Sequence, residues 1–327
     1  MNLAVIGATG LVGRKITEQI FKRGLKPDKL YLYASERSDG KILRYNGNEY
    51  VVKKLAEGNI PHDIDFAFFS AGSEISKIFA PIFRSRGALV IDNSSAFRLF
   101  CNVPLVVPEV NGETAFFHNG IIANPNCSTI QACVALSPLD KAFGLKRVIV
   151  STYQAVSGAG QRGTNDFYRG KNGLPPEKFP KNIYLDCVPQ IDCFAENGYT
   201  KEELKIINET RKILSLKKLK ITATAVRVPV LNCHAESVNA EFFKPCDEQK
   251  AKKILSAARG VVLLDDPEKG VYPTASDADG KEQVFIGRVR QDFSVESAIN
   301  MWVVADNLLK GAAANAVSIA ELLIKGR

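Results

Sequence analysis

The sequence predicts an α/β protein of two domains: a doubly wound domain with a parallel sheet, and an α+β domain with a mostly antiparallel sheet. The first observation is the continuous apolar run Leu3–Ile6, bounded by glycine as a buried parallel strand is. The second is the glycine-rich segment Gly7–Gly13, which leads into a helical apolar pattern that ends near Gly24. The third is a change after Phe143, where Val148–Val156 alternates as a strand in an antiparallel sheet does.

The strand, glycine turn and helix at the N-terminus form a variant of the Rossmann dinucleotide fingerprint. Its spacing is Gly-x-x-Gly-x-x-Gly, carried by Gly7, Gly10 and Gly13. Glycines permit the tight turn and the close approach of a pyrophosphate to the N-terminus of the helix. We therefore expect the first domain to be of Rossmann type and to bind a dinucleotide.

The end of the second expected strand, Leu30–Ala34, carries information about the cofactor. An acidic residue there often binds the ribose 2′-hydroxyl of NAD. Here Arg37 lies between Ser35 and Ser38, a combination that suits a 2′-phosphate and favours NADP. Glu36 is the opposing observation, because an inward-pointing Glu36 makes NAD plausible.

The rest of the first domain is expected to alternate strands with helices. Asn46–Gly47 between two short runs is typical of a type I′ hairpin. The expected elements are strands Lys41–Tyr45, Asn48–Val52, Asp65–Phe69, Ala88–Asp92 and Gly120–Ala123, and a helix opened by Ser70, Ala71 and Gly72. The small, polar loop Asn93–Arg98 suits a phosphate or a carboxylate, and an exposed Arg98 is the alternative.

Cys127 lies where an expected strand gives way to an apolar helical run, Thr129–Phe143. The unpaired N–H groups at a helix N-terminus favour thiolate over thiol and can hold an oxyanion. Cys127 is therefore a candidate nucleophile, and a small buried packing residue is the alternative.

The second half of the chain combines strands with one amphipathic helix and one irregular excursion. We expect the excursion at Asn172–Pro189, helices at Thr200–Leu214 and Asp306–Ile324, and strands at Ile221–Pro229, Ser237–Phe243, Gln283–Val289 and Ser297–Val304. The last helix is expected to pack back on the first sheet.

Composition excludes several classes of protein. The chain has 327 residues, 46% hydrophobic content and a net charge of +8, with no apolar run long enough to span a membrane and no signal-peptide pattern. Its seven cysteines include no Cys-x-x-Cys pair, so we expect reduced thiols in a cytoplasm and no metal site. No aromatic-interleaved basic motif for nucleic acid is present.

Several motifs together resemble the aspartate-semialdehyde dehydrogenase family. They follow one another over nearly the whole chain: Gly7–Gly13, Asp92–Arg98, Val107–Asn111, Asn124–Ser128, Gln154–Gly160, Arg227–Val230, His234–Glu236 and Asp306–Ala313. The resemblance implies NADP-dependent conversion of L-4-aspartyl phosphate to L-aspartate 4-semialdehyde and phosphate through a cysteine acyl-thioester, in lysine, threonine and methionine biosynthesis. It also implies a homodimer or homotetramer, with residues 1–126 and 306–327 binding NADP and residues 127–305 forming the catalytic and dimerisation domain.

The resemblance also implies roles for individual residues. Cys127 would be the nucleophile, His234 the acid/base and Gln154 the residue that orients the intermediate. The expected substrate-binding residues are Arg227 for the carboxylate, Glu209 for the amino group, Arg98 and Lys212 for phosphate, and Asn126 near the acyl oxygen. For Glu209 and Lys212, an exposed helix face is the alternative. The expected cofactor-binding residues are Gly7, Thr9, Gly10, Leu11, Val12, Ser35, Arg37, Ser38, Ala71, Gly72, Ser157, Gly158 and Asn307.

Three other functions are consistent with parts of the pattern. An N-acetyl-glutamyl-phosphate reductase uses the same thioester chemistry, but an acetylated amine could not pair with Glu209 as a cation. A non-catalytic NADP-binding scaffold would not need Cys127, Gln154, Arg227 and His234 together. A basic nucleic-acid binder is the weakest alternative, and its binding would fall steeply with salt.

Overall fold

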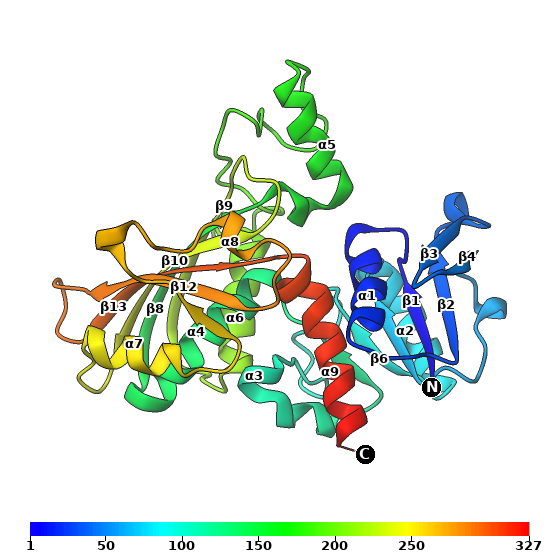
Figure 1. The fold of residues 1–327 in the computed structure, drawn as a ribbon, viewed down its shortest axis with the longest axis horizontal. Helices are drawn as coiled ribbons and strands as arrows, with labels where there is room; N and C mark the ends of the chain where they lie inside the picture. The colour runs from blue at the N-terminus through cyan, green and yellow to red at the C-terminus, as the bar shows by residue number, and fades with distance from the viewer. Residues whose placement is uncertain (327) are drawn as a thin grey trace. The chain divides into compact units, whose positions relative to one another are not determined.

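The computed structural model describes residues 1–326, and its contacts divide the chain into two compact units, which we describe one at a time (Figure 1). Unit 1 comprises Met1–Pro125 and the C-terminal segment from Ala312, and unit 2 comprises Asn126–Gly311. Unit 1 was expected to comprise residues 1–126 and 306–327. Its first segment ends one residue earlier than expected, and its second begins six residues later. Residues 306–311 belong to unit 2 because Asp306 accepts the N–H groups of Leu308, Leu309 and Gly280.

Unit 1 is built on a seven-stranded sheet in the order β3-β4-β2-β1-β5-β6-β7. The strands are β1 (Asn2–Ile6), β2 (Lys29–Ala34), β3 (Ile42–Tyr45), β4 (Asn48–Lys54), β5 (Phe66–Phe69), β6 (Leu89–Asp92) and β7 (Ile121–Ala123). All neighbours are parallel except β3 and β4, which form the expected hairpin. Because the chain leaves β1 and adds strands on both sides of it, the sheet is doubly wound, which confirms the predicted fold.

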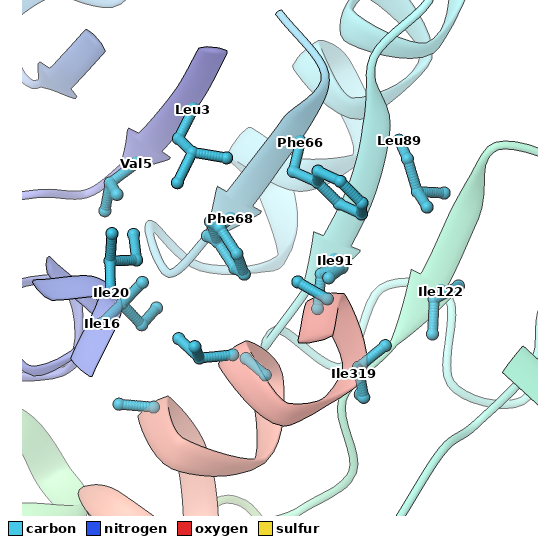
Figure 2. Packing of buried hydrophobic residues seen from close by; sticks show 14 of the residues in the cluster. Leu3, Val5, Ile16, Ile20, Phe66, Phe68, Leu89, Ile91, Ile122 and Ile319 are labelled. Atoms are coloured by element: carbon cyan, nitrogen blue, oxygen red, sulfur yellow. The ribbon is translucent and has the colours of Figure 1, made fainter. Parts of the chain in front are cut away.

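Helices complete the core of unit 1: α1 (Leu11–Lys22), α2 (Ser73–Ser85), α3 (Pro108–Asn111) and α9 (Ala314–Lys325). Figure 2 shows Ile16 and Ile20 of α1 and Ile319 of α9 beside apolar side chains of the parallel strands. Burial of this cluster is the main favourable term in folding the unit. The final helix therefore packs back on the first sheet, as expected, although it begins at Ala314 after a π-helical turn (Leu309–Ala313) rather than at Asp306.

The glycines of the N-terminal fingerprint are required by close packing. Gly7 has φ +87°, and a Cβ atom on it would lie 2.8 Å from the carbonyl oxygen of Ser70. A Cβ on Gly13 would lie 2.1 Å from the carbonyl oxygen of Gly7. Helix α1 can therefore begin directly against the end of β1 only with glycine at these positions.

Unit 2 is built on a six-stranded sheet in the order β11-β12-β13-β10-β8-β9. The strands are β8 (Leu145–Gln154), β9 (Lys220–Arg227), β10 (His234–Phe242), β11 (Val261–Leu263), β12 (Val284–Gln291) and β13 (Ala298–Ala305). The three central pairings are antiparallel, and the two outer ones are parallel. The sheet is thus mostly antiparallel, as predicted, and β10 begins three residues earlier than expected, at His234.

Five helices belong to unit 2: α4 (Cys127–Phe143), α5 (Gly160–Lys171), α6 (Lys201–Ile213), α7 (Glu248–Ser256) and α8 (Ala275–Ala278). Helix α4 packs against β10 and against both α6 and α7, which themselves contact the sheet. Helix α6 begins with a capping box between Thr200 and Glu203. Within residues 1–326, none of the helices is long and apolar enough to cross a membrane.

Residues 172–189 contain neither helix nor strand, as expected. A buried carboxylate binds backbone N–H groups in the first half of this segment. Asp166 of α5 accepts the backbone N–H groups of Glu177, Lys178 and Phe179 at 2.7–2.9 Å. Helix α5 itself was not expected, because its three glycines disfavour a helix. The structure explains two of them, since a Cβ on Gly163 or Gly170 would lie within 2.4 Å of an oxygen atom.

Candidate active site

Three side chains from separate parts of the sequence meet at one edge of the unit 2 sheet. Gln154 ends β8 and Arg227 ends β9, and the two residues are paired directly in the parallel register. His234 begins β10, whose next residue, Ala235, pairs with Tyr153 of β8. Because β10 runs antiparallel to β8, its first residue lies at the edge where β8 and β9 end.

Cys127 is the first residue of α4 and is half-buried. Asn126 is the N-cap residue, and its side-chain oxygen accepts the N–H groups of Ser128 and Thr129 at 3.0 and 3.2 Å. This cap explains why the helix begins two residues earlier than expected. A Cβ on Gly311 would lie 2.7 Å from the Cβ of Cys127, so a glycine is needed beside the cysteine.

His234 is completely buried, and its hydrogen bonds determine its tautomer. The backbone N–H of Ala155 donates to Nδ1 at 3.0 Å, so a neutral imidazole carries its proton on Nε2. Burial, reinforced by the positive charge of Arg227, holds the pKa of His234 well below its usual value. His234 therefore presents a neutral Nε2–H donor, and this atom is buried without a hydrogen-bond partner among residues 1–326.

Arg227 is also buried, and only part of its guanidinium is used within the protein. Its Nη1 donates to the carbonyl oxygen of Ala155 at 2.6 Å, whereas Nε is buried without a partner in the described chain. Burial lowers the pKa of the Arg227 guanidinium, and the nearby Glu202 and Cys127 oppose this shift. Buried polar groups are normally paired, so open donors on Arg227 and His234 are typical of a site that receives an oxygen-rich ligand.

Gly158 packs against the side chains of both Arg227 and His234. A Cβ on Gly158 would lie 2.7 Å from Nη1 of Arg227 and 3.1 Å from Nε2 of His234. The other two expected cofactor residues of unit 2 are joined nearby, since Asn307 donates to the hydroxyl of Ser157 at 3.1 Å. Asn307 also accepts the backbone N–H of Cys233, the residue before His234.

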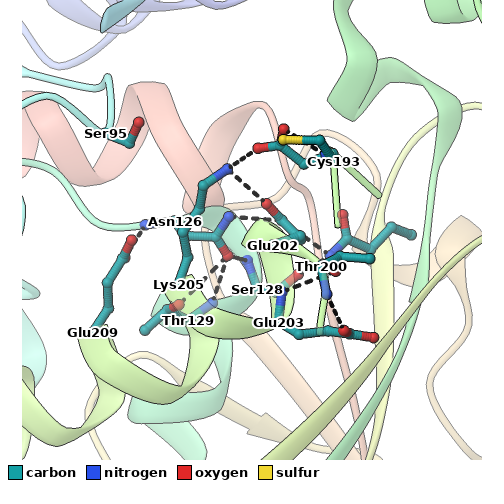
Figure 3. A network of polar contacts seen from close by, with 12 residues as sticks. Ser95, Asn126, Ser128, Thr129, Cys193, Thr200, Glu202, Glu203, Lys205 and Glu209 are labelled. Carbon is teal, nitrogen blue, oxygen red and sulfur yellow. Dashed lines mark hydrogen bonds and ion pairs between the residues drawn. The ribbon is translucent and has the colours of Figure 1, made fainter. Parts of the chain in front are cut away.

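Helix α6 adds buried carboxylates to the site (Figure 3). Glu209 is 1% exposed and accepts the backbone N–H of Asn126 at 2.7 Å, so the exposed-face alternative is wrong for this residue. Lys212, one turn later, is half-buried. Glu202 accepts the side-chain amides of Asn126 and Gln154, and sequence reasoning missed it. Helical periodicity could have found Glu202, because it lies seven residues, or two turns, before Glu209 on the same face.

The remaining expected residues lie in unit 1. Arg98 is buried rather than exposed, and it donates to the carbonyl oxygens of Asn93 and Asn124. The Ser38 hydroxyl lies 3.5 Å from that of Thr9, so the end of β2 adjoins the glycine turn. The cofactor residues here cluster after the carboxyl ends of β1, β2 and β5: Gly7, Thr9, Gly10, Leu11, Val12, Ser35, Arg37, Ser38, Ala71 and Gly72.

Comparison with protein families identifies both halves of the chain. Residues 2–116 match the model described as "Semialdehyde dehydrogenase, NAD binding domain". Residues 136–310 match the model described as "Semialdehyde dehydrogenase, dimerisation domain". The two models together cover most of the chain.

Curated relatives and solved structures agree with these matches. The chain is 50% identical to an aspartate-semialdehyde dehydrogenase of Aquifex aeolicus and 46% identical to that of Bacillus subtilis, in both cases over 99% of this chain and 98% of the relative. The crystal structure of aspartate semialdehyde dehydrogenase II from Vibrio cholerae superimposes with a TM-score of 0.95 at 46% identity, covering 99% of this chain and 98% of that one. The same Vibrio protein complexed with ASA gives 0.94 at the same identity and coverage, and a Candida albicans structure with NADP gives 0.77 at 25% identity, covering 98% of both chains.

Proposed function

The chain belongs to the aspartate-semialdehyde dehydrogenase family, and on this premise we propose that it reduces L-4-aspartyl phosphate to L-aspartate 4-semialdehyde, reversibly, with release of phosphate. The observation that carries the proposal is a half-buried cysteine at a helix N-terminus, in the same unit as two buried donors that have no partner among residues 1–326, on Arg227 and His234. A nucleophile, an oxyanion donor and a carboxylate-binding cation are the groups that acyl transfer from a small amino acid requires.

Cys127 supplies the covalent step. The Cys127 thiolate attacks the acyl carbon, a C–S bond forms, and the bond from that carbon to the phosphate oxygen breaks as phosphate leaves. NADPH, when bound, supplies the hydride that brings the thioester to the oxidation level of an aldehyde. The carbonyl then re-forms as the C–S bond breaks, which returns the thiolate to Cys127.

His234 acts on the acyl oxygen from its Nε2–H. Charge develops on this oxygen when the acyl carbon becomes tetrahedral, and a fixed N–H donor in a buried site stabilises that charge. The Ala155 N–H occupies Nδ1, so the imidazole must lose this hydrogen bond before it can take up a second proton. His234 therefore contributes chiefly as a hydrogen-bond donor in its neutral form.

The other residues bind the substrate in this proposal. Arg227 holds the α-carboxylate through its open donors, and Gln154 orients the thioester. Glu209 attracts the amino group, which a free amino acid carries as a cation and an N-acetylated substrate lacks. Lys212 binds phosphate in unit 2, and the same role is proposed for Arg98 in unit 1.

Unit 1 fits a dinucleotide. Gly10, the N-cap residue of α1, offers no side-chain cap, so the first-turn N–H groups of the helix remain available to a pyrophosphate. We propose NADP as the preferred cofactor. Glu36 pairs with Lys54 at 2.8 Å, whereas the exposed Arg37 carries the charge that a 2′-phosphate requires.

The proposed assembly is a homodimer formed through unit 2, whose family model is described as a dimerisation domain. In this assignment unit 1 binds the cofactor, and unit 2 carries out catalysis and dimerisation. Gel filtration with light scattering at several protein concentrations distinguishes a dimer from a monomer and from a tetramer.

The proposal is tested by incubating the protein with L-aspartate 4-semialdehyde, phosphate and NADP and by following NADPH absorbance. We expect formation of NADPH that depends on phosphate and is abolished in Cys127→Ala. When L-4-aspartyl phosphate is supplied without NADPH, mass spectrometry should find an aspartyl group on the Cys127 peptide. Turnover of N-acetyl-glutamyl phosphate in place of the aspartyl substrate would overturn the substrate assignment, and activity that survives in Cys127→Ala would overturn the mechanism.

A further inference from the structure

Unit 2 contains a cluster of three side chains of the kind that bind metals, and the proposed mechanism does not use them. They are Cys233, Asp279 and Asp306, and one ligand atom from each, a thiol sulfur or a carboxylate oxygen, lies within 4.8 Å of the other two. Cys233 and Asp306 are 2% and 4% exposed, whereas Asp279 is exposed to solvent. A thiol and two carboxylates therefore converge at a point that an ion can reach past Asp279.

Strand pairing brings two of these residues together. His234 pairs with Ala305 at the end of the antiparallel ladder between β10 and β13. Cys233 precedes the first of these partners and Asp306 follows the second, so the two residues lie opposite each other just beyond the ladder. Asp279 joins them from the C-cap of α8. Because the three residues come from separate segments, no spacing motif in the sequence predicts the cluster.

The Cys233 thiol is buried in surroundings that are otherwise apolar. It belongs to a hydrophobic cluster with Ala278, Phe285 and Val304. Among residues 1–326 the thiol forms no hydrogen bond, although its sulfur lies within 4.8 Å of both carboxylates. A buried thiol that faces two carboxylates without a partner is the group that a thiolate-binding cation would engage.

The two carboxylates carry negative charge that no side chain balances. Asp306 accepts only backbone N–H groups, those of Gly280, Leu308 and Leu309, at 2.8–3.0 Å. In the part of the chain that the structure describes, no lysine or arginine forms an ion pair with Asp306 or Asp279. Buried charges are normally paired with an opposite charge or bound to a metal ion. Oδ2 of Asp306 accepts the Gly280 N–H alone, so it retains a lone pair for a cation.

We propose that Cys233, Asp279 and Asp306 form a binding site for a divalent cation of the zinc type. Zn²⁺ binds thiolate sulfur at about 2.3 Å and carboxylate oxygen at about 2.0–2.2 Å, usually with four ligands in all. Three protein ligands and one water complete this number. Mg²⁺ and Ca²⁺ prefer oxygen ligands alone, so the sulfur favours zinc. On binding, a Zn–S bond forms and the thiol proton passes to the buffer.

The site adjoins the proposed active site through the backbone. Cys233 immediately precedes His234, and its N–H donates to the side chain of Asn307 at 2.9 Å. Asp306 immediately precedes Asn307. A bound ion would therefore hold the two residues that lead into His234 and Asn307.

Cobalt(II) is the first probe, because it occupies zinc sites and gives a near-ultraviolet charge-transfer band when a thiolate is its ligand. The reduced, metal-free protein is titrated with Co²⁺ and then with Zn²⁺, which binds such sites more tightly and displaces it. We expect the band in wild type and its loss in Cys233→Ser. Cys246→Ser is the matched control and should keep the band, since Cys246 is also buried but lies outside the cluster.

Asp279→Asn tests the site without disturbing the core, because Asp279 is exposed. We expect its affinity for Zn²⁺, measured by competition with a chelating dye, to fall by at least about tenfold, since even the partners of metal ligands contribute this much. Glu268→Gln removes another exposed carboxylate, outside the cluster, and should bind Zn²⁺ as wild type does. Zn²⁺ should raise the melting temperature of wild type and of Glu268→Gln more than that of Asp279→Asn.

Three results would overturn the proposal. The first is a wild-type protein that forms no cobalt band, or a band that persists unchanged in Cys233→Ser. The second is an unchanged affinity for Zn²⁺ in Asp279→Asn. The third is loss of the band in Cys127→Ala, which would place the ion at the active-site cysteine. Because none of these measurements depends on turnover of the semialdehyde, the metal site and the proposed function stand or fall separately.

Discussion

Gly158→Ala should impair catalysis much more than it impairs folding. The new Cβ would lie 2.7 Å from Nη1 of Arg227 and 3.1 Å from both Cε1 and Nε2 of His234. Arg227 is 4% exposed and its Nη1 is held by the carbonyl oxygen of Ala155 at 2.6 Å, so the guanidinium can yield only by losing that bond. The substitution therefore acts on the two side chains proposed to bind the substrate.

Two effects on stability oppose each other. Overpacking a well-packed site costs about 1–3 kcal/mol. Replacing glycine by alanine stabilises by about 0.4–1 kcal/mol through the unfolded state, because Gly158 does not have a positive φ. The net destabilisation should thus lie between nothing and about 2.6 kcal/mol.

The expected loss of kcat/KM is large, although it follows from only a small displacement of Arg227 and His234. If the two donors move by about 1 Å, kcat/KM should fall about a hundredfold, or roughly 2.7 kcal/mol in transition-state free energy. The assay is steady-state oxidation of L-aspartate 4-semialdehyde with NADP and phosphate, beside a thermal melt. Gly58→Ala, where nothing lies within 4 Å of the new Cβ, is the control and should keep full activity. Wild-type kcat/KM in Gly158→Ala would refute the reasoning.

Three further predictions concern buried carboxyls and the cofactor. Three backbone N–H groups outweigh burial and lower the pKa of Asp166, so its contribution to stability is present above the ordinary carboxyl pKa and is lost as the pH falls through the lowered value. Asp166→Asn should cost about 1–3 kcal/mol at neutral pH, measured by urea unfolding, and an unchanged midpoint would contradict this. Burial raises the pKa of Glu236 well above its usual value, so the folded state binds a proton that the unfolded chain releases, and stability falls as the pH rises above the ordinary carboxyl pKa. Glu236→Gln should therefore raise the melting temperature at neutral pH and flatten its pH dependence, and a lower melting temperature would show that the carboxyl is ionised and paired. Arg37→Ala should raise KM for NADP about 10- to 100-fold, from the loss of a charge-assisted hydrogen bond, and leave KM for NAD almost unchanged. Equal changes for both cofactors would show that Arg37 does not bind the 2′-phosphate.

The sequence predicts well those elements whose characteristic residues lie close together in the chain. The apolar run of β1, the glycines after it and the apolar face of α1 lie within about one turn or strand of one another, so spacing alone indicates a Rossmann unit. Helix α5 was missed for the opposite reason. Its glycines disfavour a helix in isolation, and only the tertiary structure shows that the carbonyl oxygen of Val156 leaves no room for a side chain at Gly163 and that Asn182 leaves none at Gly170.

The sequence by itself determined that Cys127 stands at a strand-to-helix junction and that the first unit binds a dinucleotide, because both follow from residues adjacent in the chain. Only the tertiary structure decided that Gln154, Arg227 and His234 share one sheet edge, since strand pairing across about eighty residues brings them together. It also decided the tautomer of His234, because the donor to Nδ1 is a backbone N–H that no side-chain pattern reveals. The structure also revealed Glu202, because its partners Gln154 and Asn126 lie 48 and 76 residues away in the chain.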